Sequence, residues 1–537
     1  MKIIFFALLL ISIIAVVSFA SPVFITTVTS QTNYGTLTNM YYETISGPAG
    51  STPSTNTAFI PSSSSGSYSI AQASTAYLWS PQFTSATTIS AGNWLLGLWA
   101  ATASIIVSYV PIIITNSQTT ATPSTFQEEI TWAPSSYTSY EASNLGNIRF
   151  YSSSAFTTPL YAWLESCTPS LSNTATSATA WVKLTSSIAA SGGTLTIYMA
   201  FLSTTTNFDG NYWGDAPNLS GTYGAYDNGA KVFNAYFNGN TATSSFSVYT
   251  GDTLSQATGI SGPGGTTINA IKVMGTTGAH VPAFSFNNAI SNTALIVESS
   301  FSLLAADLAN ATGAAGLVDN AAVTSIKNGI TAQMGYGSTF FSQGYEVGGT
   351  VTLDENPAGT STTNWEYASV TYTGSTATSW SAYIAPQLYS TTGGYSGTYA
   401  NNPLSSATNL YIGQISGSYA IAVYYNFMRA RAYPPNNVMP STSFGTISVA
   451  VNAITVSIYV TSSSGSIQST VASNVQSPTI GSSATQYVMM FAGSQVTVPQ
   501  NGYIMISLLA PQTASYNVYW GNGQPTNFQV PYQVLTA

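Results

Sequence analysis

Charged side chains are scarce in this sequence, since 8 lysines and arginines and 16 aspartates and glutamates make up 4% of 537 residues. Eight basic side chains are too few to neutralise the phosphates along a nucleic acid, which excludes that class of partner. The formal net charge of −8 is weak for a chain of this length. A surface of hydroxyls and amides also changes little when carboxylates protonate below about pH 4, so the composition suits an acidic exterior.

The sequence also lacks the residues of common catalytic and metal sites. His280 is the only histidine, and Cys167 is the only cysteine. One cysteine excludes an intramolecular disulfide, and we expect Cys167 to be a buried apolar side chain. No motif spacing supplies the three or four ligands of a zinc site. We interpret His280 as a loop residue and predict no cofactor, with calcium as the one ion left open.

Long apolar runs are confined to the amino terminus. Lys2 precedes the apolar run Ile3–Val17, and small residues stand at Ser18 and Ala20. This pattern predicts a signal peptide over residues 1–20 and a secreted, cell-surface-associated protein. A retained anchor is the alternative, because the run approaches the ~18 residues that span a bilayer. No later run is long enough, so the mature chain is predicted to have no transmembrane segment.

The remaining sequence is typical of an all-β protein of several domains. Residues 21–76 form a Ser/Thr-rich lead, either flexible or O-glycosylated. Strict alternation of apolar and polar residues over 454–460 predicts a half-buried strand. Strands predicted in the second block, which we expect to be a β-sandwich, are Ile105–Thr115, Phe126–Trp132, Asn147–Tyr151, Tyr161–Glu165, Ala180–Leu184 and Thr194–Phe201. A further strand is predicted over 93–100, and a Gly/Pro/Asn-rich linker over 211–224.

A long third block follows this linker. Its predicted strands lie at Ala294–Leu304, Trp365–Tyr372, Trp380–Ile384 and Tyr419–Tyr433. About 220 residues of short strands without a convincing helix indicate one large two-sheet jelly roll. We expect Trp163, Trp181, Trp365 and Trp380 to be buried, because they lie within strand patterns.

Two stretches of the chain resemble parts of archaeal surface proteins. The segments SNLGNIRFY, LYAWLES, ATAWVKL and TLTIYMAF resemble domain of unknown function 2341, and this likeness covers residues 105–215. The matching residues of that pattern are Asn144, Leu145, Trp163, Glu165, Trp181 and Lys183. The segments WEYASVTYTGS and NLYIGQIS, within residues 216–445, resemble the concanavalin A-like lectin/glucanase fold in its laminin-G-like form.

The two ends of the chain look like halves of one further sandwich. Residues 77–104 supply only two or three strands, too few to cover a hydrophobic face alone. We therefore predict a discontinuous β-sandwich built from 77–104 and 446–537, with both central domains inserted into it. The alternative is a disordered lead with two edge strands.

Few residues are candidates for chemistry. Glu298, Arg429 and Arg431 are candidate ligand-binding residues, although the arginines, which face the same way at i and i+2, could instead pair with carboxylates across a sheet. Candidate calcium ligands are Asp354, Glu355 and Asn356, which we place in a turn. Glycosylation sequons begin at Asn218 and Asn310.

The resemblance to lectins and glucanases implies binding of carbohydrate or its hydrolysis. The glucanase pattern of alternating acids is missing, because Glu298 stands alone on its predicted strand. We therefore predict a non-catalytic secreted or cell-surface protein for glycan binding or adhesion, whose partner is a glycan or another surface protein. The alternatives are a structural subunit of an envelope layer or extracellular filament, and a secreted glycoside hydrolase.

Overall fold

The computed structural model describes residues 34–37, 40–43, 58–59, 66–80, 82–248, 253–275, 283–286, 290, 295–303, 313–318, 328–334, 341–347, 350–356, 365–373, 380–385, 395–400, 404, 409–413, 421–450, 452–481, 483–520 and 527–531. Strands dominate these residues, and the predicted fold class, all-β with several sandwiches that include a jelly roll, is confirmed. In the described part of the chain, no helix is long and apolar enough to cross a membrane. The signal peptide, His280 and Asn310 lie outside the described residues.

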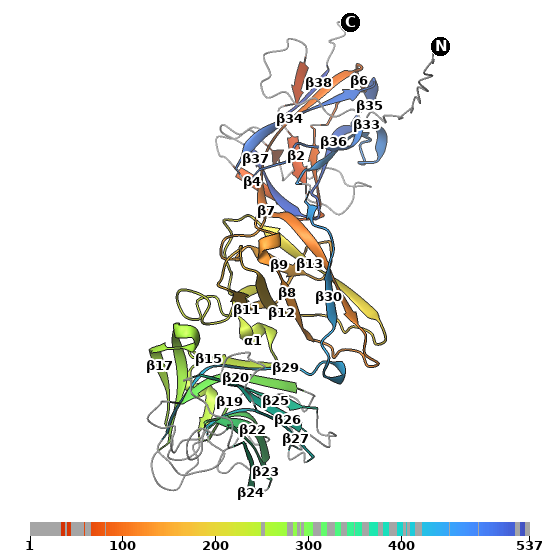
Figure 1. Cartoon of the computed structure of the whole chain (residues 1–537). Coiled ribbons are helices and arrows are strands. Elements are labelled where there is room, and N and C mark those ends of the chain that lie inside the picture. Colours follow the sequence, from red (N-terminus) through yellow and green to blue (C-terminus); the bar gives the residue numbers. More distant parts are fainter. Residues whose placement is uncertain are drawn as a thin grey trace, which may run out of the picture. The chain divides into compact units, whose positions relative to one another are not determined.

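The chain divides into two compact units, of which the first is discontinuous in sequence. It contains the described residues up to Ile105 and those after Val451, whereas Ile106–Ala450 form the second unit. One sheet of the first unit is built around residues 92–105 of the long strand β7 (Figure 1). Its other strands are β1 (Tyr34–Leu37), β4 (Gly66–Ile70), β34 (Thr485–Gly493), β37 (Ala514–Trp520) and β38 (Asn527–Pro531).

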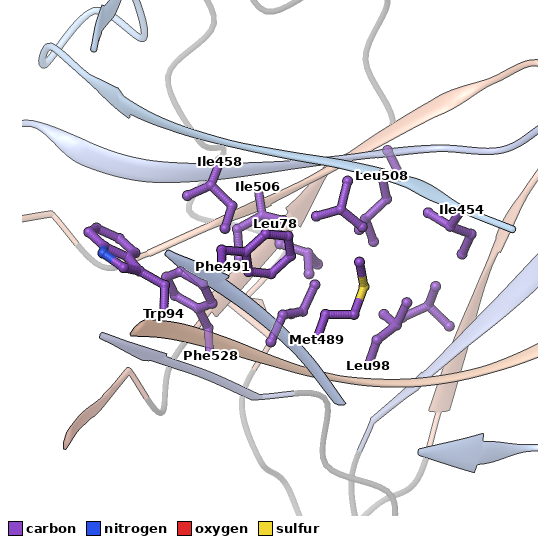
Figure 2. Close-up of a cluster of buried hydrophobic side chains, with 14 of the residues drawn as sticks. Leu78, Trp94, Leu98, Ile454, Ile458, Met489, Phe491, Ile506, Leu508 and Phe528 are labelled. Atoms are coloured by element: carbon purple, nitrogen blue, oxygen red, sulfur yellow. The ribbon is translucent and has the colours of Figure 1, made fainter. Parts of the chain in front are cut away.

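A second sheet of this unit joins both segments of the chain in the same way. Its order is β3 (Ala58–Phe59), β2 (Met40–Glu43), β5 (Thr75–Trp79), β36 (Tyr503–Leu509), β32 (Thr455–Thr461) and β33 (Ile467–Gln476). A short pair consists of β6 (Thr87–Ile89) and β35 (Val496–Val498). Trp94, Leu98, Ile458 and Phe491 meet in one buried core, so segments far apart in sequence share it (Figure 2).

Part of the Ser/Thr-rich lead belongs to these sheets. The lead contains β1, β2, β3 and β4, and β2 pairs with β5 while β4 pairs with β37. Composition alone indicated a flexible or glycosylated segment, and that interpretation is corrected for these strands. Hydrogen bonding to neighbouring strands, which for β1 and β4 lie near the carboxyl terminus, orders these mostly polar residues.

The second unit begins with a two-sheet sandwich, called the first sandwich below. One sheet contains residues 106–116 of β7, with β9 (Ile148–Tyr151), β10 (Pro159–Leu160), β13 (Gly193–Leu202), β30 (Ser441–Phe444) and β31 (Ser448–Val449). The other has the order β14 (Trp213–Asp215), β11 (Ala162–Thr168), β12 (Ser177–Lys183) and β8 (Gln127–Trp132). A buried apolar core that includes Ile112, Ile130, Leu164 and Val182 fills the space between them.

The second sandwich of this unit is the jelly roll. One sheet has the order β17 (Thr253–Ser261), β18 (Thr267–Gly275), β29 (Ile421–Ala432), β20 (Leu295–Leu303), β25 (Glu366–Tyr372), β26 (Trp380–Ala385) and β27 (Tyr395–Tyr399), and β15 (Ala235–Asn238) also pairs with β29. The facing sheet has the order β16 (Phe246–Val248), β19 (Ala283–Phe286), β28 (Asn409–Gly413), β21 (Gly313–Val318), β22 (Asn328–Met334), β23 (Phe341–Val347) and β24 (Thr350–Asn356). Val297, Leu317 and Val370 belong to the core between the sheets.

Helical segments in the described residues are short. They are α1 (Gly229–Val232) and the 3₁₀ turns Pro134–Ser136, Thr243–Ser245, Pro263–Gly265 and Pro435–Asn437. α1 stands between the two sandwiches of the second unit in sequence and brings Lys231 to the surface.

Three local predictions are corrected. Residues 93–100 and 105–115 belong to one continuous strand, β7 (Gly92–Asn116), because ladders on both sides continue through the expected break. The expected linker contains β14, whose Trp213 is fully buried and donates its indole N–H to the Leu145 carbonyl at 2.8 Å. Asp354, Glu355 and Asn356 lie in β24 rather than in a turn.

Candidate functional site

Two arginines of β29 form the centre of a buried ion cluster in the second unit. Arg429 lies directly opposite Glu298 of the neighbouring strand β20, and its Nε donates to the Glu298 carboxylate at 2.6 Å. Arg431, two residues further along the same face, donates to both oxygens of Glu298 at 3.3 and 3.4 Å. The i and i+2 spacing therefore places two cations on one carboxylate.

The first sandwich supplies the second carboxylate and an aromatic cage. Arg429 Nη1 lies 2.5 Å from Glu165 Oε1, and Trp181 donates its indole N–H to the other Glu165 oxygen at 3.0 Å. The Arg429 guanidinium carbon stands 4.8 Å from the Trp181 ring centre, 5.4 Å from Trp163 and 5.0 Å from Phe233. Cation–π attraction is strongest at such desolvated sites, so the rings stabilise the buried charge.

The two arginines stabilise the Glu298 carboxylate. Burial by itself would raise the pKa of Glu298, but Arg429 and Arg431 outweigh it and lower the pKa to about 2. Tyr367 donates its hydroxyl to Glu298 at 2.9 Å, and the pKa of Tyr367 is raised by burial and by this carboxylate. Both Glu298 and Glu165 are therefore held by paired cations and donors, which is what makes buried ions tolerable.

This geometry does not support ligand binding by Glu298, Arg429 and Arg431. Glu298 is 6% exposed and Arg429 is 1% exposed, and their polar groups are directed at each other and at Glu165. The cross-sheet pairing considered for the arginines is the arrangement observed. The three residues join the two sandwiches internally rather than facing solvent.

The other predicted residues lie as follows. Trp163, Trp181, Trp365 and Trp380 are all buried, as predicted. Asn218 is half-buried in a hydrogen-bonded turn, where Gly224 N–H donates to the Pro217 carbonyl at 2.8 Å. Glycosylation at Asn218 stays a prediction.

Asp227 is a second buried connection, which sequence reasoning missed. Its Oδ1 accepts from the Trp163 indole at 2.8 Å and from Gly229 N–H at 3.0 Å. Its Oδ2 accepts from the Tyr236 hydroxyl and from the Asn238 amide, each at 2.5 Å. Burial raises the pKa of Asp227 even though these hydrogen bonds oppose the shift. No local motif marks this residue, since its donors lie in β11, at the start of α1 and in β15.

The sheet face that carries Trp163 and Trp181 continues to an open end. Tyr212 and Tyr161 immediately precede the parallel pair β14 and β11, in which Trp213 lies beside Ala162. Tyr161 in turn lies beside Lys183 of β12, whose N–H donates to the Tyr161 carbonyl at 2.9 Å. Neighbouring strands thus present Tyr212, Tyr161 and Lys183 side by side on one face, because successive residues of a strand alternate between faces.

Tyr161 and Tyr212 form a partly exposed aromatic row. The Tyr161 and Tyr212 rings are stacked, with centroids 5.1 Å apart and planes inclined by 13°. That spacing follows from the roughly 4.8 Å separation of adjacent strands. Tyr161 is 36% exposed, and Lys231 of α1 places its Nζ 5.9 Å from the Tyr161 ring centre. We call Tyr161, Tyr212, Lys183 and Lys231 the tyrosine–lysine platform.

The opposite face of the same sheet contains acids without ionic partners. Glu128 and Asp215 are fully buried, and Glu141 is 2% exposed. Burial raises the pKa of these carboxyls to about 9 for Glu128, about 8 for Glu141 and about 7 for Asp215. Among the described residues, neither Glu128 oxygen has a hydrogen-bond partner. Burial thus favours the neutral form of all three carboxyls, most strongly at Glu128.

No family model matches the sequence, so the resemblance to domain of unknown function 2341 stays a prediction. The chain is 42% identical over 352 residues to uncharacterized protein 562 of Sulfolobus islandicus rod-shaped virus 1. The similar region covers 63% of this chain and 59% of the viral protein.

Two solved structures show limited similarity. The carbohydrate-binding module CBM66 from Bacillus subtilis is 13% identical and matches 34% of this chain and 97% of the module, with a TM-score of 0.24. The lectin from Bauhinia forficata in complex with GalNAc is 10% identical and matches 37% of this chain and 98% of the lectin, with a TM-score of 0.24. At these scores we base the function on the chain's own residues.

Proposed function

We propose that this protein is a non-catalytic, surface-exposed glycan-binding protein, secreted or attached to a cell or virion surface. The observation that carries the proposal is the stacked pair Tyr161 and Tyr212 at the end of a sheet face, of which Tyr161 is exposed and Tyr212 is half-buried. Aromatic rings offer apolar area with a polar tip, which suits a ligand that is both ring-shaped and rich in hydroxyls. Neither phenol hydroxyl has a hydrogen-bond partner among the described residues.

The framework beneath the rings also favours recognition. Ala162 N–H donates to the Tyr212 carbonyl at 2.9 Å, so the backbones that carry the rings are fixed to each other. A rigid site loses little conformational entropy when it binds, which leaves more of the contact energy as affinity. A non-catalytic role is consistent with Glu298, because that carboxylate is buried and held by two arginines.

A glycan array with purified chain from residue 21 onward tests this function. We expect binding to a subset of carbohydrates and no release of reducing sugar from any bound oligosaccharide. Release of reducing ends would support the glycoside hydrolase instead. Absence of binding to every glycan on the array would contradict the proposal.

The similarity to a viral protein favours a second candidate, a structural component of a virion or envelope layer. The discontinuous sandwich would then serve assembly. Immunogold labelling of virions and of host cell surfaces separates the two. A continuous, regularly spaced label along a particle supports the structural candidate, whereas sparse label with glycan-inhibitable attachment supports recognition.

A further inference from the structure

We propose that the tyrosine–lysine platform binds an acidic sugar, one whose ring carries a carboxylate or a sulfate. This inference rests on the glycan recognition proposed above and names its ligand class. It depends on the two lysines rather than on the rings alone. Tyr161 and Tyr212 would contact the sugar ring, while Lys183 and Lys231 would hold its acidic group.

The positive charge at the platform is uncompensated, unlike that of the arginines. Arg149 pairs with Asp209 at 3.2 Å, and the two arginines of β29 pair with buried glutamates. In the part of the chain that the structure describes, no carboxylate lies within 4.0 Å of the Lys183 or Lys231 ammonium. Two like charges brought together without an acid attract an anion, and they do so in a chain with only 8 basic residues.

Both ammonium groups are positioned but retain donors for a ligand. Lys183 Nζ donates to the Lys231 carbonyl at 3.1 Å, and Lys231 Nζ donates to the Asn211 side-chain oxygen. An ammonium has three N–H donors, so each lysine keeps two. Partial burial lowers the pKa of Lys183.

The arrangement matches the two chemical faces of an acidic sugar. The exposed part of the Tyr161 ring offers apolar area, which the flat C–H face of a pyranose can cover. The Lys231 ammonium stands beside that ring, and Lys183 Nζ contacts the Lys231 carbonyl. Charge-assisted hydrogen bonds from such ammonium groups to a carboxylate or sulfate are stronger than neutral ones. A neutral sugar would satisfy the ring but leave the lysines without an anionic partner.

Binding of a galacturonic acid oligomer and of its methyl ester to the chain from residue 21 onward tests the inference, because the ester keeps the ring and removes the charge. We expect the acid to bind more tightly than the ester and its affinity to fall with added salt. Lys231→Gln and Lys183→Gln should each weaken binding of the acid by about tenfold, the effect of one charge-assisted hydrogen bond. Neither variant should change binding of the ester by more than about twofold.

Lys272→Gln is the matched control, because Lys272 also stands over a tyrosine ring, 5.6 Å from the centre of Tyr424, but has no stacked second tyrosine. It should bind the acid as the wild type does. A sulfated oligomer in place of the acid distinguishes sulfate from carboxylate recognition within the same site. Tyr161→Ala should weaken the binding of both the acid and the ester. If this variant fails to fold, Lys183→Gln and Lys231→Gln test the inference without it.

The outcomes separate the two proposals. If the wild type binds glycans but the acid and ester bind equally, or if the lysine variants match Lys272→Gln, the platform inference is overturned and glycan recognition stands. If the wild type binds neither oligomer nor any glycan on the array, both are overturned. Selective loss of acid binding in Lys183→Gln and Lys231→Gln supports both.

Discussion

Glu128 makes the stability of the second unit dependent on pH. Glu128 lies on the same face of β8 as Ile130 and Trp132, which belong to the core of the first sandwich. Its side chain is fully buried, and both carboxyl oxygens lack a hydrogen-bond partner among the described residues. A charged carboxylate would be strongly destabilised there, so the folded protein keeps this group protonated.

The magnitude follows from the pKa difference between the folded and unfolded states. Burial raises the pKa of Glu128 from 4.5 to about 9, repulsion from Glu129 adds to the shift, and Arg431 opposes it. A raised pKa contributes stability that is fully present below pH 4.5 and is lost as pH rises toward 9. Between pH 4.5 and pH 7 the loss amounts to about 3 kcal/mol, at roughly 1.4 kcal/mol per pH unit.

Denaturant unfolding of the wild type and of Glu128→Gln across pH 4 to 9 measures this effect. The glutamine cannot ionise, so we expect the unfolding midpoint of the second unit to fall less steeply with rising pH in the variant. The two midpoints should converge at acidic pH, apart from a constant offset from the amide. Parallel pH profiles for the two proteins would refute the reasoning, because they would mean that Glu128 titrates alike in the folded and unfolded states.

Four further outcomes are expected. Arg429→Met leaves two buried carboxylates without their main cation and should cost about 3–5 kcal/mol in denaturant unfolding, and equal stability would show that the cluster is dispensable. Because the pKa of Glu298 is lowered to about 2, its stabilisation is present above pH 4.5 and lost as pH falls through 2, so the deficit of Glu298→Gln should shrink on acidification. Asp227→Asn places amide donors against donors and should cost about 1–3 kcal/mol, with Asp227→Ala as comparison. Replacing residues 106–450 by a short glycine linker should leave a folded first unit, and a random-coil circular dichroism spectrum would contradict this.

Residues 106–450 can be replaced by a short linker because the first and last strands of the second unit lie next to each other. Ser448 of β31 pairs with Tyr109 of β7, and Ala450 N–H donates to the Val107 carbonyl at 3.0 Å. The chain therefore enters and leaves the second unit on adjacent antiparallel strands. Insertions into a host domain are tolerated at such closely spaced ends.

The alternation of apolar and polar residues made strands predictable from the sequence. It did not predict which strands or side chains contact each other. The segment 454–460 was predicted as a strand, and β32 (Thr455–Thr461) lies there with inward Val456 and Ile458. The arginine spacing likewise predicted two side chains on one face. Nothing local indicated that Glu165, 264 residues before Arg429, is their second partner, because the contact is made between two sandwiches.

Polar composition led to wrong predictions in segments that become ordered only by pairing with strands elsewhere in the fold. The lead and the expected linker are rich in Ser, Thr, Gly and Asn, yet β2 and β14 are ladder strands in them. Backbone hydrogen bonds do not depend on side-chain polarity, so a strand flanked by partners needs little apolar surface of its own. The aromatic row was missed for the same reason, since Tyr161 and Tyr212 meet only when β11 and β14 pair.

One sheet face of the first sandwich unites the buried cluster and the proposed binding site. Trp163 and Trp181 pack around Arg429 in its covered part, and Tyr161 and Lys183 lie two residues further along the same strands. Ion pairs and ring contacts with the second sandwich fix these strands, so the platform side chains inherit a defined spacing in addition to their own ring and lysine contacts. A site supported in this way is preorganised, and a ligand that fits it pays little to order it. Loosening the cluster should therefore weaken glycan binding even though no residue of the cluster touches the ligand.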